Sequence, residues 1–143
     1  MEYRRFQDHL ILRMDRGEEI QEQLKLVCQR EQVQLASVSA LGAVDDFTVG
    51  VFHTDSKHYA ANRFTGAYEI VSLTGTVTTK DGDYYAHLHM SAGDERGQVF
   101  GGHLNSARVS ATCEMVVHIL PGRVERRFDE EIGLNLFRFL PDN

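Results

Sequence analysis

Apolar residues recur at helical spacing in one stretch near the start of the chain. Four of them follow the spacing i, i+4, i+7 and i+8 and therefore share one helical face: Ile20, Leu24, Val27, Cys28. Asp15, followed three residues later by Glu18, has the form of a helix start. The pattern predicts one helix, from Gly17 to Glu31.

Most of the remaining chain shows the alternation of apolar and polar residues that is typical of β-strands. The clearest case is segment 109–119, where one face carries Val109, Ala111, Cys113, Met115, Val117 and Ile119. Residues 68–77 are rich in β-branched and aromatic types and end before Asp81-Gly82, a strong hairpin signal. Residues 47–51 also alternate, and 134–140 is expected to add a last strand.

These patterns predict an α+β fold, a mainly antiparallel β-sheet with one flanking N-terminal helix. The chain has 143 residues, only two prolines and no linker-like segment, so we expect a single domain over residues 1–143.

Composition narrows the classes of protein further. The net charge of −6 argues against a protein that coats nucleic acid with its whole surface. The two cysteines, Cys28 and Cys113, are far apart and form neither a disulfide framework nor a cysteine-based zinc motif. No segment approaches the roughly 20 apolar residues of a membrane helix. We expect a reduced, cytoplasmic protein that does not associate with membranes.

Three of the seven histidines fall within residues 87–104. On a strand, His87 and His89 point to the same face with α-carbons about 6.5 Å apart, while Leu88 and Met90 face the core. That separation allows two imidazole nitrogens to bind one zinc ion at about 2.0–2.1 Å.

A hairpin would bring in the third histidine. The polar segment 93–97 predicts a turn. With the turn centred on residues 95 and 96, regular pairing places Gly102 opposite His89, and His103 then lies on the face opposite to that of His89. One extra residue, as a β-bulge at Gly101-Gly102, would bring His103 opposite His89. The sequence therefore predicts a metal site formed by His87, His89 and His103.

Three neutral imidazoles suit Zn²⁺ best, with Ni²⁺, Cu²⁺ and Fe²⁺ as alternatives, and they leave a fourth position open to water. Glu114 is the candidate to orient a histidine, fill the fourth position or act as a general base, and a solvated carboxylate is the alternative interpretation. The other four histidines show no comparable spacing and are interpreted as ordinary surface or core residues: His9, His53, His58, His118.

The stretch HLHMSAGDERGQVFGGHL resembles the signature of the plants-and-prokaryotes-conserved (PPC) domain. The similarity continues in GAYEIVSLTGTV (66–77) and in residues 17–44, so it spans nearly the whole chain. The resemblance implies an antiparallel sheet with a flanking helix, assembled as a homotrimer. Some prokaryotic members carry a metal, usually zinc, on three histidines, and the resemblance implies that His87, His89 and His103 are these residues. Glu114 matches a recurrent family glutamate.

In related plant proteins the domain follows an AT-hook and assembles protein partners, and the block corresponding to residues 66–71 is implicated in those contacts. By resemblance, that region is the candidate surface for a protein or small-molecule partner. No Gly-Arg-Pro hook is present here, and Ala67 stands where an arginine is frequent in the family.

Three functions are in competition. The first is a metal-binding homotrimer that acts as a regulatory or ligand-binding module. The second is a zinc-dependent hydrolase or lyase, for which Glu114 is the only base that the sequence offers. The third is DNA binding through Arg123, Arg126 and Arg127, but the acidic residues around them favour a solvated charged segment. We prefer the first, and regard an enzyme and DNA as less favoured.

Overall fold

The computed structural model describes residues 1–139, which form eight β-strands and one helix. This confirms the predicted combination of a mainly antiparallel sheet with one N-terminal helix. The elements in chain order are β1 (Glu2–Phe6), β2 (His9–Asp15), α1 (Ile20–Arg30), β3 (Ala36–His53), β4 (His58–Lys80), β5 (Asp83–Gly93), β6 (Val99–Ile119), β7 (Glu125–Asp129) and β8 (Leu134–Arg138).

Helix α1 begins later than the sequence predicts. Glu19 is its N-cap, and its side chain accepts a hydrogen bond from the backbone N–H of Glu22. The residues before it belong to a strand contact instead, because Gly17 N–H donates to Val109 O and Val109 N–H donates to Glu18 O. The predicted start at Gly17 is therefore wrong by three residues.

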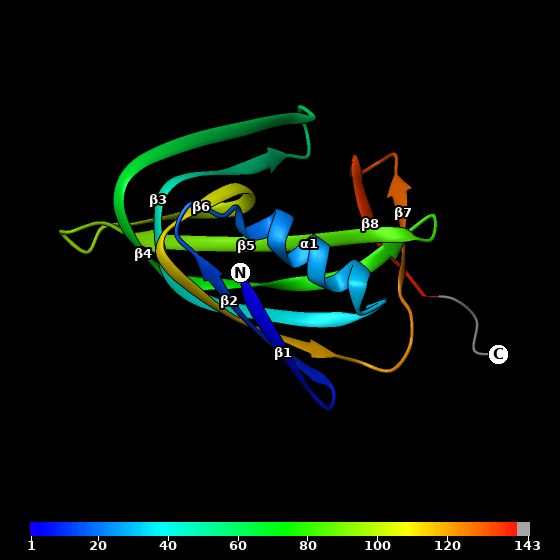
Figure 1. Cartoon of the computed structure of the whole chain (residues 1–143). Coiled ribbons are helices and arrows are strands. Elements are labelled where there is room, and N and C mark those ends of the chain that lie inside the picture. Colours follow the sequence, from blue (N-terminus) through cyan, green and yellow to red (C-terminus); the bar gives the residue numbers. More distant parts are fainter. Residues whose placement is uncertain (140–143) are drawn as a thin grey trace.

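The sheet is held together by three long, curved strands, β3, β4 and β6 (Figure 1). Antiparallel pairing of β3 with β4, β4 with β5, β5 with β6 and β6 with β3 forms a closed circuit of hydrogen-bonded strands. The hairpin β1–β2 extends one side through β6, and the hairpin β7–β8 extends the other through a parallel contact with β4. The predicted last strand is confirmed as β8, although residue 140 lies outside the described part.

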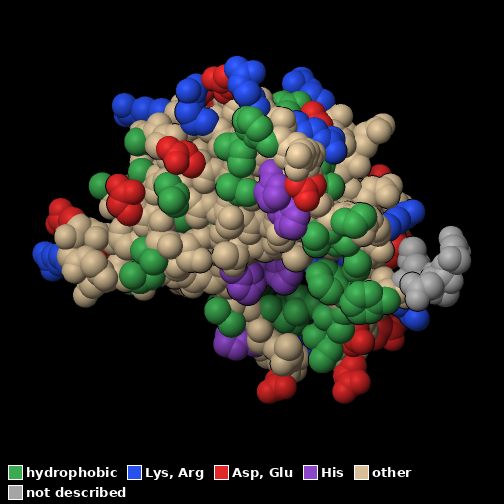
Figure 2. All heavy atoms as spheres, turned by 90° about the horizontal axis from the view of Figure 1, so that it is seen from below, with side chains coloured by type: hydrophobic (Ala, Val, Ile, Leu, Met, Phe, Trp, Pro, Cys, Tyr) green, Lys and Arg blue, Asp and Glu red, His purple; other side chains and the backbone are tan. Residues whose placement is uncertain are grey.

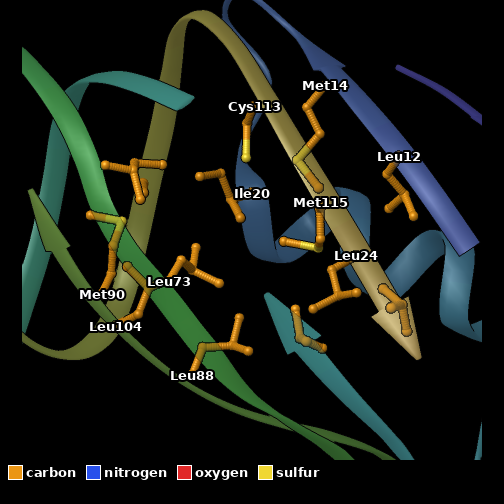
Figure 3. Packing of buried hydrophobic residues seen from close by; sticks show 14 of the residues in the cluster. Leu12, Met14, Ile20, Leu24, Leu73, Leu88, Met90, Leu104, Cys113 and Met115 are labelled. Carbon is orange, nitrogen blue, oxygen red and sulfur yellow. The ribbon is translucent and has the colours of Figure 1, made fainter. Parts of the chain in front are cut away.

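The core lies between α1 and the sheet (Figure 3). All four residues of the predicted helix face are fully buried, which confirms the face, and Leu24 lies near Met115 of β6 in the close-up. Along β6 the predicted apolar face is buried except at Ile119, which is partly buried, and at Ala111, which is exposed. The pairing of β3 with β6 shifts between Gly42 and Val44, so alternation is interrupted there.

Cys28 and Cys113 are buried and free, and burial raises the pKa of each thiol to about 12. Both therefore stay protonated and unreactive at neutral pH, in agreement with the absence of a disulfide framework that the sequence predicts.

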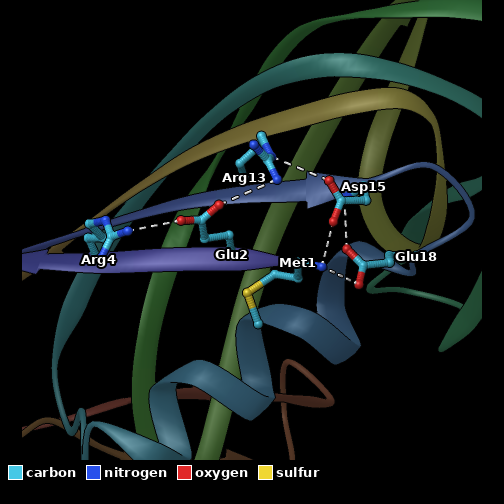
Figure 4. Close-up of polar contacts among 6 residues, drawn as sticks. All are labelled: Met1, Glu2, Arg4, Arg13, Asp15 and Glu18. Atoms are coloured by element: carbon cyan, nitrogen blue, oxygen red, sulfur yellow. Dashed lines mark hydrogen bonds and ion pairs between the residues drawn. The ribbon is translucent and has the colours of Figure 1, made fainter.

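A polar network joins the hairpin β1–β2 to the start of the helix (Figure 4). The amino group of Met1 donates to the carboxylates of Asp15 and Glu18 at 2.8 and 2.7 Å. Arg13 lies between Glu2 and Asp15. The N-terminal amine, chiefly through its hydrogen bond, lowers the pKa of the Asp15 carboxyl. These pairs are mostly exposed, so each stabilises the fold only slightly.

No helix within residues 1–139 combines the length and the apolar character that a membrane crossing requires.

Candidate metal centre

The hairpin of β5 and β6 sets the positions of the histidines. His89 pairs directly with His103, and pairing continues in regular register to Gly93 and Val99, without a bulge. The predicted bulge at Gly101-Gly102 is therefore wrong. The connecting loop holds five residues, 94–98, closed by Asp94 N–H donating to Gln98 O. An odd-numbered loop centred on residue 96 shifts the register by one residue, so His103 faces the same side as His89 without any extra residue.

The two glycines instead allow strands to approach closely. A Cβ at Gly102 would lie 2.6 Å from the carbonyl oxygen of Gly50 in β3, and one at Gly101 would lie 2.8 Å from Met90 O. Both distances are far below van der Waals contact, so only glycine fits. His103 thus follows directly after a tightly packed segment of β6, and this packing holds the backbone of His103 in place.

The three histidines form a cluster. One ligand nitrogen from each of His87, His89 and His103 lies within 4.8 Å of the other two. The rings are inclined to one another, at 73° for His87 and His89, 88° for His89 and His103, and 44° for His87 and His103. Because the lone pair of an imidazole nitrogen lies in the ring plane, inclined planes can meet at one point. Tetrahedral zinc needs nitrogens about 3.3 Å apart, which small side-chain rotations would reach.

The surroundings keep the cluster in the form that binds metal ions. Burial, followed by the repulsion that a protonated His87 would meet from a protonated His103 and from Arg126, lowers the pKa of His87 to about 4. Burial and His89 also lower the pKa of His103. Both rings are therefore neutral at pH 7, with a lone pair free for coordination.

A cavity of about 800 Å³ opens over the cluster. Its walls come from the ends of β3 to β6 and from the hairpin β7–β8. Histidine side chains gather on this face of the molecule beside a group of hydrophobic side chains (Figure 2). Tyr59 closes one side, where its hydroxyl donates to Asn105 Oδ1 at 2.6 Å. The lining residues are Gly50, Val51, Phe52, Tyr59, Tyr85, His87, His89, Gly102, His103, Asn105, Arg126, Leu134, Asn135, Leu136 and Phe137.

Sequence reasoning missed Arg126. The prediction of a solvated segment is wrong for this residue, which is only 6% exposed and lines the cavity. Its Nε–H donates to Thr78 Oγ1 and its Nη1–H to Asn135 O, both at 2.9 Å. Alternation along β7 turns Arg126 inward and Arg127 outward. The inward face became evident only from the parallel contact of β7 with β4, which the sequence does not signal.

Glu114 is not part of the cavity. It is exposed, in the half of β6 that pairs with β2, where it lies opposite Arg13. The structure therefore brings together the three histidines but not the glutamate. No hydrogen bond from a described residue reaches the ring nitrogens of these three histidines, so no carboxylate within residues 1–139 orients them.

A second histidine group, which the sequence did not indicate, lies across β2 and β6. His9 pairs with His118, and Asp8 contacts both, at 2.6 Å to His9 Nδ1 and 3.3 Å to His118 Nε2. Ligand atoms of the three residues also lie within 4.8 Å of one another. Only the pairing of β2 with β6 brings His9 and His118 together. Because these residues are far apart in the chain, their sequence spacing does not indicate a shared site.

The proposed partner region also has a defined place. Residues 65–68 face the loop 94–98 across a small hollow of about 280 Å³, apart from the histidine cavity. A partner at residues 66–71 remains a prediction.

Fold and site together define a small β-rich domain with a pocket lined by three histidines and one buried arginine. The chain belongs to the Plants and Prokaryotes Conserved domain family, whose model matches residues 1–121. This confirms the resemblance seen in the sequence. The hairpin β7–β8 lies beyond the matched range.

Solved structures of three relatives share the fold. A metal-containing protein from Archaeoglobus fulgidus is 34% identical, with a TM-score of 0.87 and coverage of 96% of this chain and 97% of that one. A plant- and prokaryote-conserved protein from Pyrococcus horikoshii is 31% identical, with a TM-score of 0.84 and coverage of 97% and 94%. A protein from Bacteroides thetaiotaomicron, named for a suspected DNA-binding role, is 28% identical, with a TM-score of 0.94 and coverage of 96% of each chain.

Among curated proteins, the bifunctional protein GlmU of a Synechococcus strain is 30% identical over 122 residues, which is 84% of this chain. The aligned part spans only 18% of the length of that protein.

Proposed function

We propose that this protein binds a divalent metal ion, zinc in the first place, through His87, His89 and His103, and acts as a metal-dependent module that binds a small ligand. The observation that carries the proposal is the convergence of three ligand nitrogens within 4.8 Å at the wall of an open cavity. The inclined rings and the lowered pKa values of His87 and His103 support it. So does the relative from Archaeoglobus fulgidus, which is named a metal-containing protein.

A binding role has more support than the two alternatives. A zinc hydrolase or lyase would need a base beside the metal, and Glu114 lies outside the cavity lining. DNA binding would need a basic surface, yet Arg126 points into the cavity and Arg123 is paired with Glu125.

We also propose that the protein is a homotrimer, as the family resemblance implies. Exposed apolar side chains outside the cavity lining provide surface for self-association, among them Val71 of β4, Val99 of β6 and Phe128 of β7. Light scattering coupled to size-exclusion chromatography measures the mass directly. A mass of one chain at micromolar concentration would refute the trimer and leave the metal site untouched.

Metal content per chain is the decisive measurement. Untagged protein is purified, saturated with zinc, dialysed and measured by elemental mass spectrometry, next to His103→Ala and the matched control His58→Ala. His58 lies at the hairpin end of β4, outside the cavity lining. We expect about one zinc ion per chain in the wild type and the control, and close to none in His103→Ala.

Equal zinc content in all three proteins would refute the three-histidine site. So would the absence of zinc from the wild type at saturating concentration. Circular dichroism of each variant verifies that the sheet is intact, which we expect because His103 belongs to the cavity wall and not to the buried core.

A further inference from the structure

We infer that the cavity binds a small organic monocarboxylate, with its carboxylate held by Arg126 beside the three histidines and its apolar body against the hairpin β7–β8. This inference names the ligand class of the proposed ligand-binding function and rests on that function, with a bound metal ion as a second contact for the carboxylate.

Arg126 is a buried cation for which residues 1–139 offer no anionic partner. Within residues 1–139 it makes no ion pair, although Arg123 in the same segment does. The chain has 21 acidic residues, but no aspartate or glutamate lines the cavity. Burial of an unpaired charge is costly, and such charges in proteins are normally paired or reserved for a ligand. Residues 1–139 supply no such anion, and we therefore assign it to a ligand bound in the cavity.

The hydrogen bonds of Arg126 leave part of its guanidinium free. Of its five N–H groups, Nε–H donates to Thr78, one on Nη1 donates to Asn135 O, and one on Nη2 reaches Thr76 Oγ1 at 3.4 Å. One N–H on each terminal nitrogen remains, which suits the two oxygens of a carboxylate. The ring of Tyr85 at 4.7 Å and that of Phe137 at 4.5 Å fix the orientation of the group.

Arg126 lies next to the histidines. Thr76, which it contacts, is the direct partner of His87 in the pairing of β4 with β5. The positive charge of Arg126 also contributes to the low pKa of His87. A ligand carboxylate on Arg126 is thus beside the cluster, and a carboxylate oxygen is an ordinary ligand for the coordination position that three histidines leave open on zinc.

The remaining walls indicate the rest of the ligand. Arg126 is the only lysine or arginine in the lining, whereas a phosphate group typically draws on several donors or a helix N-terminus. Apolar side chains at the mouth remain partly exposed, among them Val51 at 56% and Phe137 at 47%. A monocarboxylate with an aromatic or aliphatic body matches both the single cation and this apolar rim.

The test uses three acids and their neutral counterparts. Benzoate, phenylacetate and hexanoate are titrated by calorimetry into zinc-loaded and metal-free protein, together with benzamide, phenylacetamide and hexanamide and with inorganic phosphate. We expect at least one acid to bind the wild type and its amide to bind at least about 10-fold more weakly, because the amide lacks the charge-assisted hydrogen bonds. Phosphate should also bind at least about 10-fold more weakly, because the lining offers it a single cation and an apolar rim.

Variants assign the binding to Arg126. Arg126→Met should weaken binding of the acid by about 10-fold to 100-fold, with its zinc content measured in parallel. Arg127→Met, its exposed neighbour, should bind as the wild type does. If Arg126→Met fails to fold, NMR of the wild type provides the test. The Nε–H resonance of Arg126, assigned by its loss in Arg126→Lys, should shift when the acid is added.

The outcomes separate the two proposals. No binding by any acid, equal binding of acid and amide, or an unshifted Arg126 resonance would overturn the carboxylate inference while leaving the metal measurement intact. Tighter binding of phosphate than of every acid would also overturn it. Binding of an acid through Arg126 by a protein that takes up no zinc would sustain the inference and refute the metal site.

Discussion

Two histidine groups share strand β6, and in both the ligand atoms lie within 4.8 Å of one another, but their rings are arranged differently. In the cavity group, His87, His89 and His103 have planes inclined by 44° to 88°. In the edge group, His9 and His118 are stacked with centroids 4.4 Å apart and planes only 2° apart. Lone pairs in parallel, separated planes do not point at a common ion, so the edge group would have to rotate before both rings could bind one metal.

Their surroundings differ as well. In both groups two side chains are partly buried and one is exposed, but in the edge group the Asp8 carboxylate already contacts both rings. The cavity group has no carboxylate among the described residues of the cavity lining, and it faces an open volume. Distance between ligand atoms is therefore a weak criterion for a metal site. Ring orientation and free coordination capacity discriminate better.

Zinc affinity should separate the groups most strongly. We expect His87→Ala and His89→Ala each to weaken zinc binding by at least about 100-fold, since two imidazoles replace three, and His9→Ala and His118→Ala to leave it within about twofold. Competition with a chromophoric chelator measures the affinities. A loss in the edge variants as large as in the cavity variants would contradict the distinction.

The next largest effect is expected from the glycine that precedes His103. Gly102→Ala forces a methyl group against the backbone of Gly50, and we expect a loss of about 1–3 kcal/mol in the free energy of unfolding. Urea denaturation measures it. Gly93→Ala is the matched control on β5, where the nearest atom would lie at an ordinary 3.5 Å and the change should be small. Equal stability of the two variants would show that the close approach is not required.

The smallest effect concerns the edge group and pH. Burial raises the pKa of Asp8, but its hydrogen bond with His9 and further contacts outweigh this, so the pKa is lowered overall. A lowered carboxyl pKa stabilises the fold above its usual value near 3.9 and loses that contribution as the pH falls. Asp8→Asn should therefore lower the thermal midpoint slightly at pH 6, less than Gly102→Ala does, and this difference should vanish as the pH falls through the lowered pKa of Asp8. A difference that persists unchanged in acid would argue against the ionised carboxylate as its source.

Local sequence determined much of this protein. The spacing of Ile20 to Cys28 fixed the buried face of α1, and alternation fixed which side of β5 carries His87 and His89, because both depend only on the geometry of one element. The histidine cluster was predicted for a partly wrong reason. Its register comes from the length of the loop 94–98, and turn length is read less reliably from sequence than strand pattern.

Tertiary structure alone decided the rest. Arg126 reaches the cavity because β7 pairs in parallel with β4, and Glu114 is kept away because β6 extends beyond the cavity to pair with β2. His9 and His118 meet through the same pairing of β2 with β6. Each of these placements joins segments far apart in the chain, and their side chains carry no periodic signal that could reveal the pairing. The sequence by itself determined the faces of the elements, whereas contacts between distant strands determined which side chains share a site.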